Sequence, residues 1–144
     1  MKKYIIWIFG TLYSLSVIIT LASIGVCKNT EMKCHTMYHS VMNSVLPVIV
    51  ICVIGIVISY ISKTGKATAI YSIIASLVAF ALYVWAFISS FDICANPNMK
   101  CHNLTGPVMR IMALIGMVLF GMMFSIRFFK GFKNSLNKRK QELK

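Results

Sequence analysis

The chain has 144 residues, of which 58% are hydrophobic and only 12% are charged. In water-soluble domains about a quarter of the residues are charged, so this composition excludes an ordinary soluble fold and favours the lipid bilayer. The formal net charge of +12 comes from 15 basic and 3 acidic residues. So few carboxylates, with no catalytic triad, phosphate-binding loop or carboxylate pair in the sequence, argue against acid–base enzymology, and a non-enzymatic role is favoured.

Four long apolar runs predict transmembrane helices, because a hydrocarbon core of about 30 Å requires about 20 apolar residues. They cover residues 4–26, 42–62, 67–91 and 107–126. The fourth includes Arg110, whose long side chain we expect to reach the membrane surface. The first is too long for the apolar core of a signal peptide, so we interpret it as a retained anchor. The predicted fold is an all-α integral membrane bundle of four transmembrane helices.

Basic residues predict the orientation of the bundle. Eleven lysines and arginines fall before the first span, between the second and third, or after the fourth. The opposite side has only Lys28, Lys33, Lys100 and the borderline Arg110. Because cytoplasmic segments carry the excess of positive charge, we expect a multi-pass cell-membrane protein with both termini in the cytoplasm.

The basic tail, residues 127–144, has Phe128, Phe132 and Leu136 at intervals of four residues. This spacing predicts an amphipathic helix on the inner membrane surface; a stop-transfer tail that is partly disordered is the alternative. The expected partner is the lipid bilayer rather than nucleic acid. Candidate contacts to lipid headgroups are Lys130, Lys133, Lys138, Arg139 and Lys140.

A short motif occurs twice. The segment 27–35 reads CKNTEMKCH and the segment 94–102, 67 residues later, reads CANPNMKCH. Each copy follows an odd-numbered span, so residues 1–66 and 67–126 are predicted to form two parallel helical hairpins with outward-facing tips. Parallel repeats are related by an axis along the membrane normal, which would bring the two tips together.

The tips carry the only candidate site chemistry. The main candidates, for metal binding or disulfide formation, are the four cysteines Cys27, Cys34, Cys94 and Cys101. One methionine and one histidine of each copy are supporting metal ligands: Met32, His35, Met99 and His102. Thiolate, thioether and imidazole ligands suit copper(I), zinc or haem iron. Further soft donors near the same surface are Met37, His39, Met42 and Met109, although His39 has no counterpart in the second copy.

Disulfide bonds are the alternative interpretation of the tips, since thiols outside the cytoplasm meet oxidising conditions. Cys27 with Cys34 and Cys94 with Cys101 would each close a short loop, and pairing between the two copies is equally compatible. The fifth cysteine, Cys52, lies within the second span and is predicted to be a small core residue.

Ionisable residues are absent from the centres of the spans, where pumps and channels usually place them. A stand-alone transport function is therefore disfavoured. Near the outer boundary of the second hairpin, we expect an ion pair between Asp92 and Arg110.

The paired Met-Lys-Cys-His tips, Met32–His35 and Met99–His102, with four spans and a short chain, resemble an uncharacterised bacterial membrane family, domain-of-unknown-function family 4418. The resemblance implies an accessory or sensor subunit of an ATP-driven permease of the macrolide-exporter type. The alternative function is a membrane thiol-disulfide oxidoreductase similar to the quinone-coupled disulfide-forming enzymes. This chain lacks their C-x-x-C pair, which lowers a thiol pKa. Whether the chain forms a homo-oligomer is left open.

Overall fold

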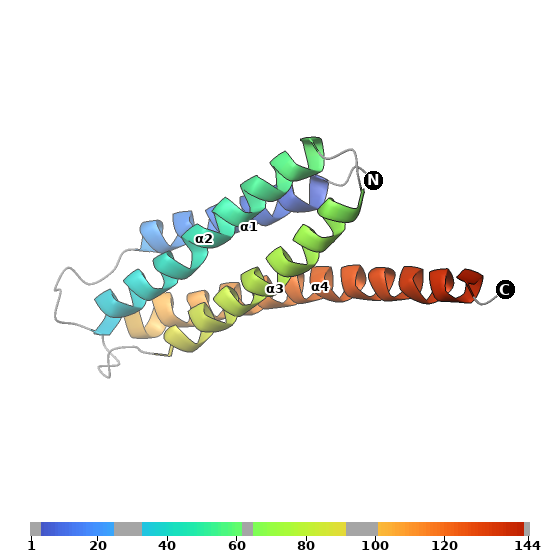
Figure 1. Ribbon diagram of the computed structural model, residues 1–144. Helices are drawn as coiled ribbons and strands as arrows, with labels where there is room; N and C mark the ends of the chain where they lie inside the picture. The colour runs from blue at the N-terminus through green and yellow to red at the C-terminus, as the bar shows by residue number, and fades with distance from the viewer. Residues whose placement is uncertain (1–3, 25–32, 62–64, 92–100, 143–144) are drawn as a thin grey trace.

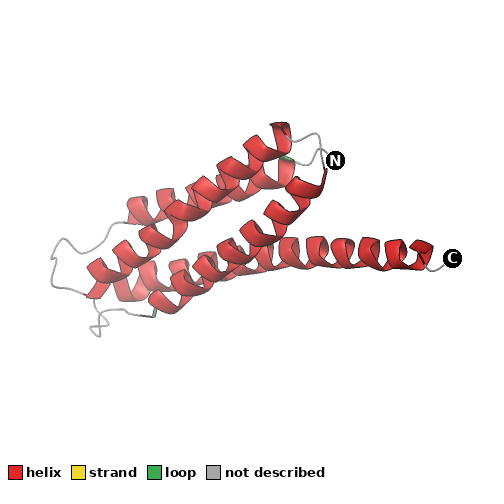
Figure 2. Ribbon diagram, in the orientation of Figure 1, coloured by secondary structure: helices red, strands yellow, loops and turns green. Residues whose placement is uncertain are grey.

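The computed structural model describes residues 4–24, 33–61, 65–91 and 101–142. These segments form four helices, α1 (Ile5–Ile24), α2 (Lys33–Ile61), α3 (Gly65–Ser89) and α4 (Gly106–Glu142). A short π-helical turn, η1 (Cys101–Thr105), leads directly into α4. The part of the chain that the structure describes contains no strand (Figure 2). The all-α prediction is confirmed.

Each helix is long and apolar enough to cross a membrane, as predicted. Two of the four, α2 and α4, extend well beyond the predicted apolar runs. α2 begins at Lys33 rather than at residue 42, so its first turns, which hold Lys33, His35 and His39, precede the predicted apolar run. Hydropathy identifies the part of a helix that lies in lipid, whereas backbone hydrogen bonding determines where the helix begins.

The basic tail continues α4 as one helix to Glu142 and projects beyond the other three helices (Figure 1). Of the two alternatives for this tail, the described backbone therefore supports the helix, but the helix extends the fourth span and is not a separate element. Lys130 and Lys133 are exposed on it. Lys138, Arg139 and Lys140 occupy helical backbone positions, and their side chains lie outside the described residues.

Helices that follow each other in the chain pack against each other, whereas α1 and α4 contact each other at few positions. The start of α1 and the end of α4 lie at one end of the bundle, which we call the basic end (Figure 1). α2 and α4 both begin at the opposite end, the tip end (Figure 1). The helices therefore bring the described parts of both motif copies to the same end, as the hairpin prediction requires.

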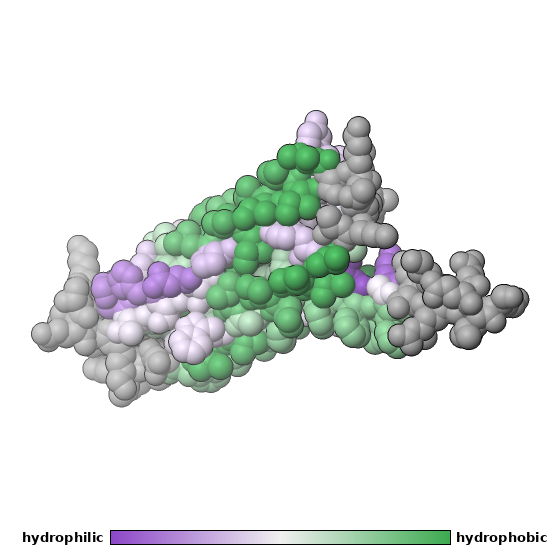
Figure 3. All heavy atoms as spheres, in the orientation of Figure 1, coloured by the Kyte–Doolittle hydropathy of each residue, from purple (hydrophilic) through white to green (hydrophobic). Residues whose placement is uncertain are grey.

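Large aromatic side chains fill the core. Trp7 is 1% exposed and lies 5.9 Å from the ring of Tyr71, and Tyr83 stacks on Phe120 at 5.5 Å between ring centroids. The outer surface is apolar along the middle of the bundle, and hydrophilic residues gather near the start of α2 (Figure 3). Large apolar side chains are also exposed on the outside, among them Phe9, Tyr60 and Trp85, as expected of a surface that faces lipid.

The two hairpins bury corresponding faces, but not at the offset of the motif. At the 67-residue offset of the motif, buried Trp7 and Leu21 correspond to Ile74 and Ile88, each 58% exposed. The buried faces of α1 and α3 coincide at an offset of 69 residues, and those of α2 and α4 coincide at an offset of 68. The pairs at 69 are Trp7 with Ser76, Ser14 with Tyr83, and Leu21 with Ser90, which directly follows α3. The pairs at 68 are Val41 with Met109, Val45 with Ala113, and Cys52 with Phe120. A π-helical turn takes up an additional residue, so η1 accounts for the one-residue difference in α4. The described residues do not show the repeat as a symmetry of the bundle.

The buried hydroxyls of Ser14 and Tyr83 lie 3.0 Å apart and form a hydrogen bond between α1 and α3. We expect Tyr83→Phe to lower the free energy of unfolding by about 0.6 kcal/mol, the average for interhelical hydrogen bonds in membranes. Ser14→Ala should cost a similar amount, and the two substitutions together should cost less than their sum. Unfolding in sodium dodecyl sulfate, followed by far-UV circular dichroism, checks this; additive costs would contradict it.

Candidate functional site

The tip end holds the described part of the candidate site. Cys34 and His35 lie in the first turn of α2, and Cys101 and His102 open η1. The side chains of Cys34, Cys101 and His102 lie outside the described residues, as do the whole of the remaining candidates: Cys27, Met32, Cys94 and Met99. Of the eight candidate ligands, His35 is therefore the one whose side chain the structure places.

His35 has a second histidine beside it. The rings of His35 and His39 lie 4.5 Å apart between centroids in an edge-to-face contact. Residues four apart share one face of a helix, so both imidazoles project from the same side of α2. His35 is half-buried and His39 is exposed, with the ring of Tyr38 5.5 Å from His39. Two histidines four residues apart on one helix face have the spacing that helical zinc sites use for two of their ligands.

The methionines proposed as further soft donors are packing residues. Met37 and Met109 are 1% and 2% exposed and belong to the hydrophobic core, and the half-buried Met42 packs against it. A thioether is a flexible apolar group that fills irregular core gaps, which is the use made of it at these positions. These three sulfurs are therefore not placed at an open ligand site.

Two polar groups at the second tip lack hydrogen bonds among the described residues. The hydroxyl oxygen of Thr105 in η1 and Nε of Arg110 in α4 are buried without a partner. The guanidinium of Arg110 lies over the ring of Phe91 at 4.2 Å from the centroid, a cation–π contact. Its predicted partner Asp92 lies outside the described residues, so the ion pair stays a prediction.

Cys52 is not part of this site. It is fully buried in the core, which confirms its predicted role as a small core residue. Its Sγ lies 3.0 Å from the place where a Cβ on Gly10 would stand. This close approach of α1 and α2 shuts the thiol away from both lipid and water.

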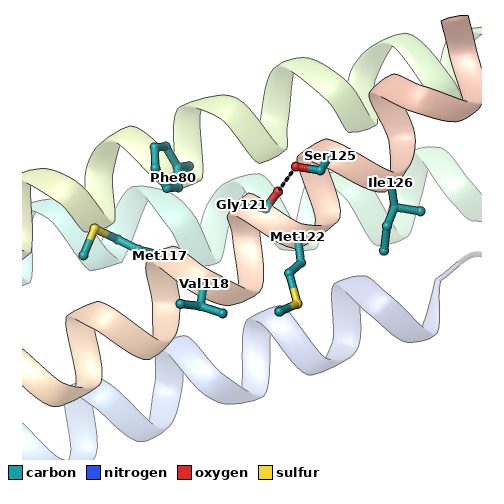
Figure 4. Close-up of a pocket in the computed structure, with 7 residues that line it drawn as sticks. All are labelled: Phe80, Met117, Val118, Gly121, Met122, Ser125 and Ile126. Atoms are coloured by element: carbon teal, nitrogen blue, oxygen red, sulfur yellow. Dashed lines mark hydrogen bonds between the residues drawn. The ribbon is translucent and has the colours of Figure 1, made fainter.

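Two hollows lie along α4, away from the tip end. The first, of about 460 Å³, lies between α3 and α4 and is lined by Phe80, Met117, Val118, Gly121, Met122, Ser125 and Ile126 (Figure 4). Its hydroxyl group is already satisfied, because Ser125 donates to the carbonyl oxygen of Gly121 at 2.9 Å. The second, of about 550 Å³, lies between α1 and α4 and is also apolar. Neither presents a group for catalysis.

The described residues include no cluster of three or more histidine, cysteine or acidic side chains, so the His35–His39 pair is at most part of a ligand set. His39 was predicted only as a donor without a counterpart in the second copy, although its spacing of four residues from His35 indicates a shared helix face. Comparison with protein-family models, with curated proteins and with solved structures found no match to this chain.

Proposed function

We propose that this chain is a non-enzymatic membrane subunit, an accessory or sensor protein of an ATP-driven permease, whose tip end binds copper or zinc. The observation that carries the metal-binding part is the contact between His35 and His39 on one face of α2. The permease part rests on the resemblance to family 4418. With the positive-inside prediction, the tip end faces the outside of the cell.

The remaining ligands are expected from the cysteines of the two tips. A histidine pair supplies two of the four positions that zinc usually fills in proteins, and thiolates are its commonest companions. Cys34 precedes His35 in α2, and Cys101 opens η1 at the same end of the bundle (Figure 1). A metal bound there would link the second and fourth helices, which suits a sensor whose helix positions respond to the metal.

The oxidoreductase alternative has less support. A quinone-coupled enzyme needs a polar contact for the quinone oxygen within its apolar pocket. The hydroxyl group that lines the apolar groove between α1 and α4 is that of Tyr13. It already donates to the carbonyl oxygen of Met112, so it is not available to a quinone oxygen. We therefore expect the tip cysteines to act as ligands or structural disulfides rather than as a redox relay.

Native mass spectrometry of the full chain tests this proposal, with protein purified in detergent without reductant or chelator and then supplied with zinc or copper. We expect one bound metal, with affinity falling more than about 100-fold in His35→Ala and in His39→Ala, because even residues that only orient ligands contribute 10- to 100-fold. Asn43→Ala is the matched control, since Asn43 is exposed one turn beyond His39 on the same face.

The outcomes separate the alternatives. Equal metal binding in the wild type and both histidine variants would contradict the His35–His39 site. A mass deficit of about 4 Da with no metal would indicate two disulfides and support structural or redox tips instead. The double variant Cys34→Ser/Cys101→Ser should lose the metal if the cysteines complete the ligand set.

A further inference from the structure

A groove lies between α1 and α4, which pack against each other at few positions. It has a volume of about 550 Å³ and is lined by Ile6, Phe9, Gly10, Leu12, Tyr13, Leu119, Phe120 and Met123. Phe9 and Leu12 are 68% and 57% exposed. Because the hydroxyl of Tyr13 is already donating to a backbone carbonyl, the groove offers its occupant apolar contacts only.

Basic side chains continue this groove toward the basic end. Arg127 and Lys130 follow Met123 by four and seven residues, so all three lie on one face of α4. Arg127 is half-buried and Lys130 is exposed. The distance along α4 from Leu119 to Arg127 is about 12 Å at 1.5 Å per residue, close to the thickness of one hydrocarbon leaflet.

The other hollow of α4 continues into a mixed surface toward the basic end. Its face, which includes Ser125, continues with Phe129 and Phe132, four and seven residues later, and these side chains are 69% and 58% exposed. Ile126, at the other edge of this hollow, is followed by exposed Lys130 and Lys133 at four and seven residues. The face toward α1 differs in also carrying the half-buried Arg127. A ligand with an apolar chain and an anionic head matches the face toward α1, where Arg127 and Lys130 follow the groove residue Met123.

We propose that the α1–α4 groove is a binding site for one anionic phospholipid, with an acyl chain in the groove and the phosphate held by Arg127 and Lys130. An apolar cleft opening to a membrane surface is filled by lipid chains, and cations at that surface select anionic heads. This site lies at the end opposite the tips and does not depend on their chemistry.

Native mass spectrometry of the delipidated full chain, titrated with phosphatidylglycerol or with phosphatidylcholine of the same chains, tests the site. We expect tighter binding of phosphatidylglycerol, and we expect Arg127→Gln/Lys130→Gln to weaken it by roughly 25-fold, from about fivefold for each cation removed. Arg139→Gln is the matched charge control, because position 139 lies 12 residues beyond Arg127 and a third of a turn round the helix.

A second, independent experiment fills the groove with a larger side chain. Leu119→Trp should displace the chain and lower phosphatidylglycerol binding more than tenfold. Leu114→Trp should not, since Leu114 is similarly exposed, at 48% against 43%, but lies on another face of α4. The melting temperature of each variant is measured beside its binding, and Phe9→Trp replaces Leu119→Trp if the latter fails to fold.

Four results would overturn the proposal. They are equal affinity for the two lipids, loss of binding in Arg139→Gln equal to that in the double variant, retained binding in the folded groove-filling variant, and a second copy of this chain occupying the groove. The last would appear as a dimer mass that Leu119→Trp removes.

Discussion

Replacing Trp7 by alanine is expected to lower the free energy of unfolding by about 3 kcal/mol, the largest single effect in the bundle. Trp7 is 1% exposed, lies against the backbone of Gly55 and packs on the ring of Tyr71. In a bilayer the lost term is van der Waals packing rather than transfer from water, because lipid is as apolar as the core. The cavity alone accounts for a cost of this size.

Trp85 provides the matched control, since it is the other tryptophan of the chain and is 60% exposed. Trp85→Ala should change the unfolding free energy by less than about 1 kcal/mol, because no core cavity forms. Titration with sodium dodecyl sulfate, followed by far-UV circular dichroism, measures both variants. Equal costs at the two positions would show that Trp7 does not hold α1 against its neighbours.

Gly116→Ala is expected to separate α3 from α4 and to cost about 2 kcal/mol, the usual penalty of overpacking. A Cβ at Gly116 would stand 2.5 Å from ring atoms of Tyr83, a distance at which one helix must shift. The ring of Tyr83 has no free space to move into, because it stacks on Phe120 and its hydroxyl bonds Ser14. The added methyl group therefore displaces backbone.

Gly121→Ala on the same helix is the control. Its Cβ would stand 3.5 Å from the ring of Phe80, an ordinary van der Waals contact, so we expect little change in stability. In a Tyr83→Ala background, Gly116→Ala should become nearly neutral as well. A cost that persists there would mean that the glycine matters for the conformation of α4 rather than for its contact with Tyr83.

The spans were predictable because residues that face lipid share one apolar solvent, so hydropathy along the chain is a direct signal. The sidedness, which rests on the distribution of basic residues, stays a prediction. The helices α1 and α3 begin and end within a few residues of the predicted runs. The start of α2 and the continuation of α4 through the basic tail as one helix were not predicted. Both lie in polar segments, where hydropathy does not indicate a helix and helix continuity depends on backbone hydrogen bonds.

The candidate site was predictable in its residue types but not in its geometry. Cysteine, methionine and histidine were identified from the repeated motif, yet the position of Met37 and Met109 in the core depends on which helix face turns inward. His39 was undervalued because it has no counterpart in the second copy. Its contact with His35 follows from the helical spacing of four residues, a local signal that the repeat obscured.

By itself the sequence determined the membrane class, the four spans and the residue types at the tips, because these depend on composition and on local order along the chain. The tertiary structure alone decided which face of each helix is buried, where the π-helical turn shifts α4 by a residue, and that α1 and α4 leave a groove between them. The reason is physical. Hydropathy is nearly uniform around these helices, so the close approach of Trp7 to Gly55 and of Tyr83 to Gly116 selects the packing.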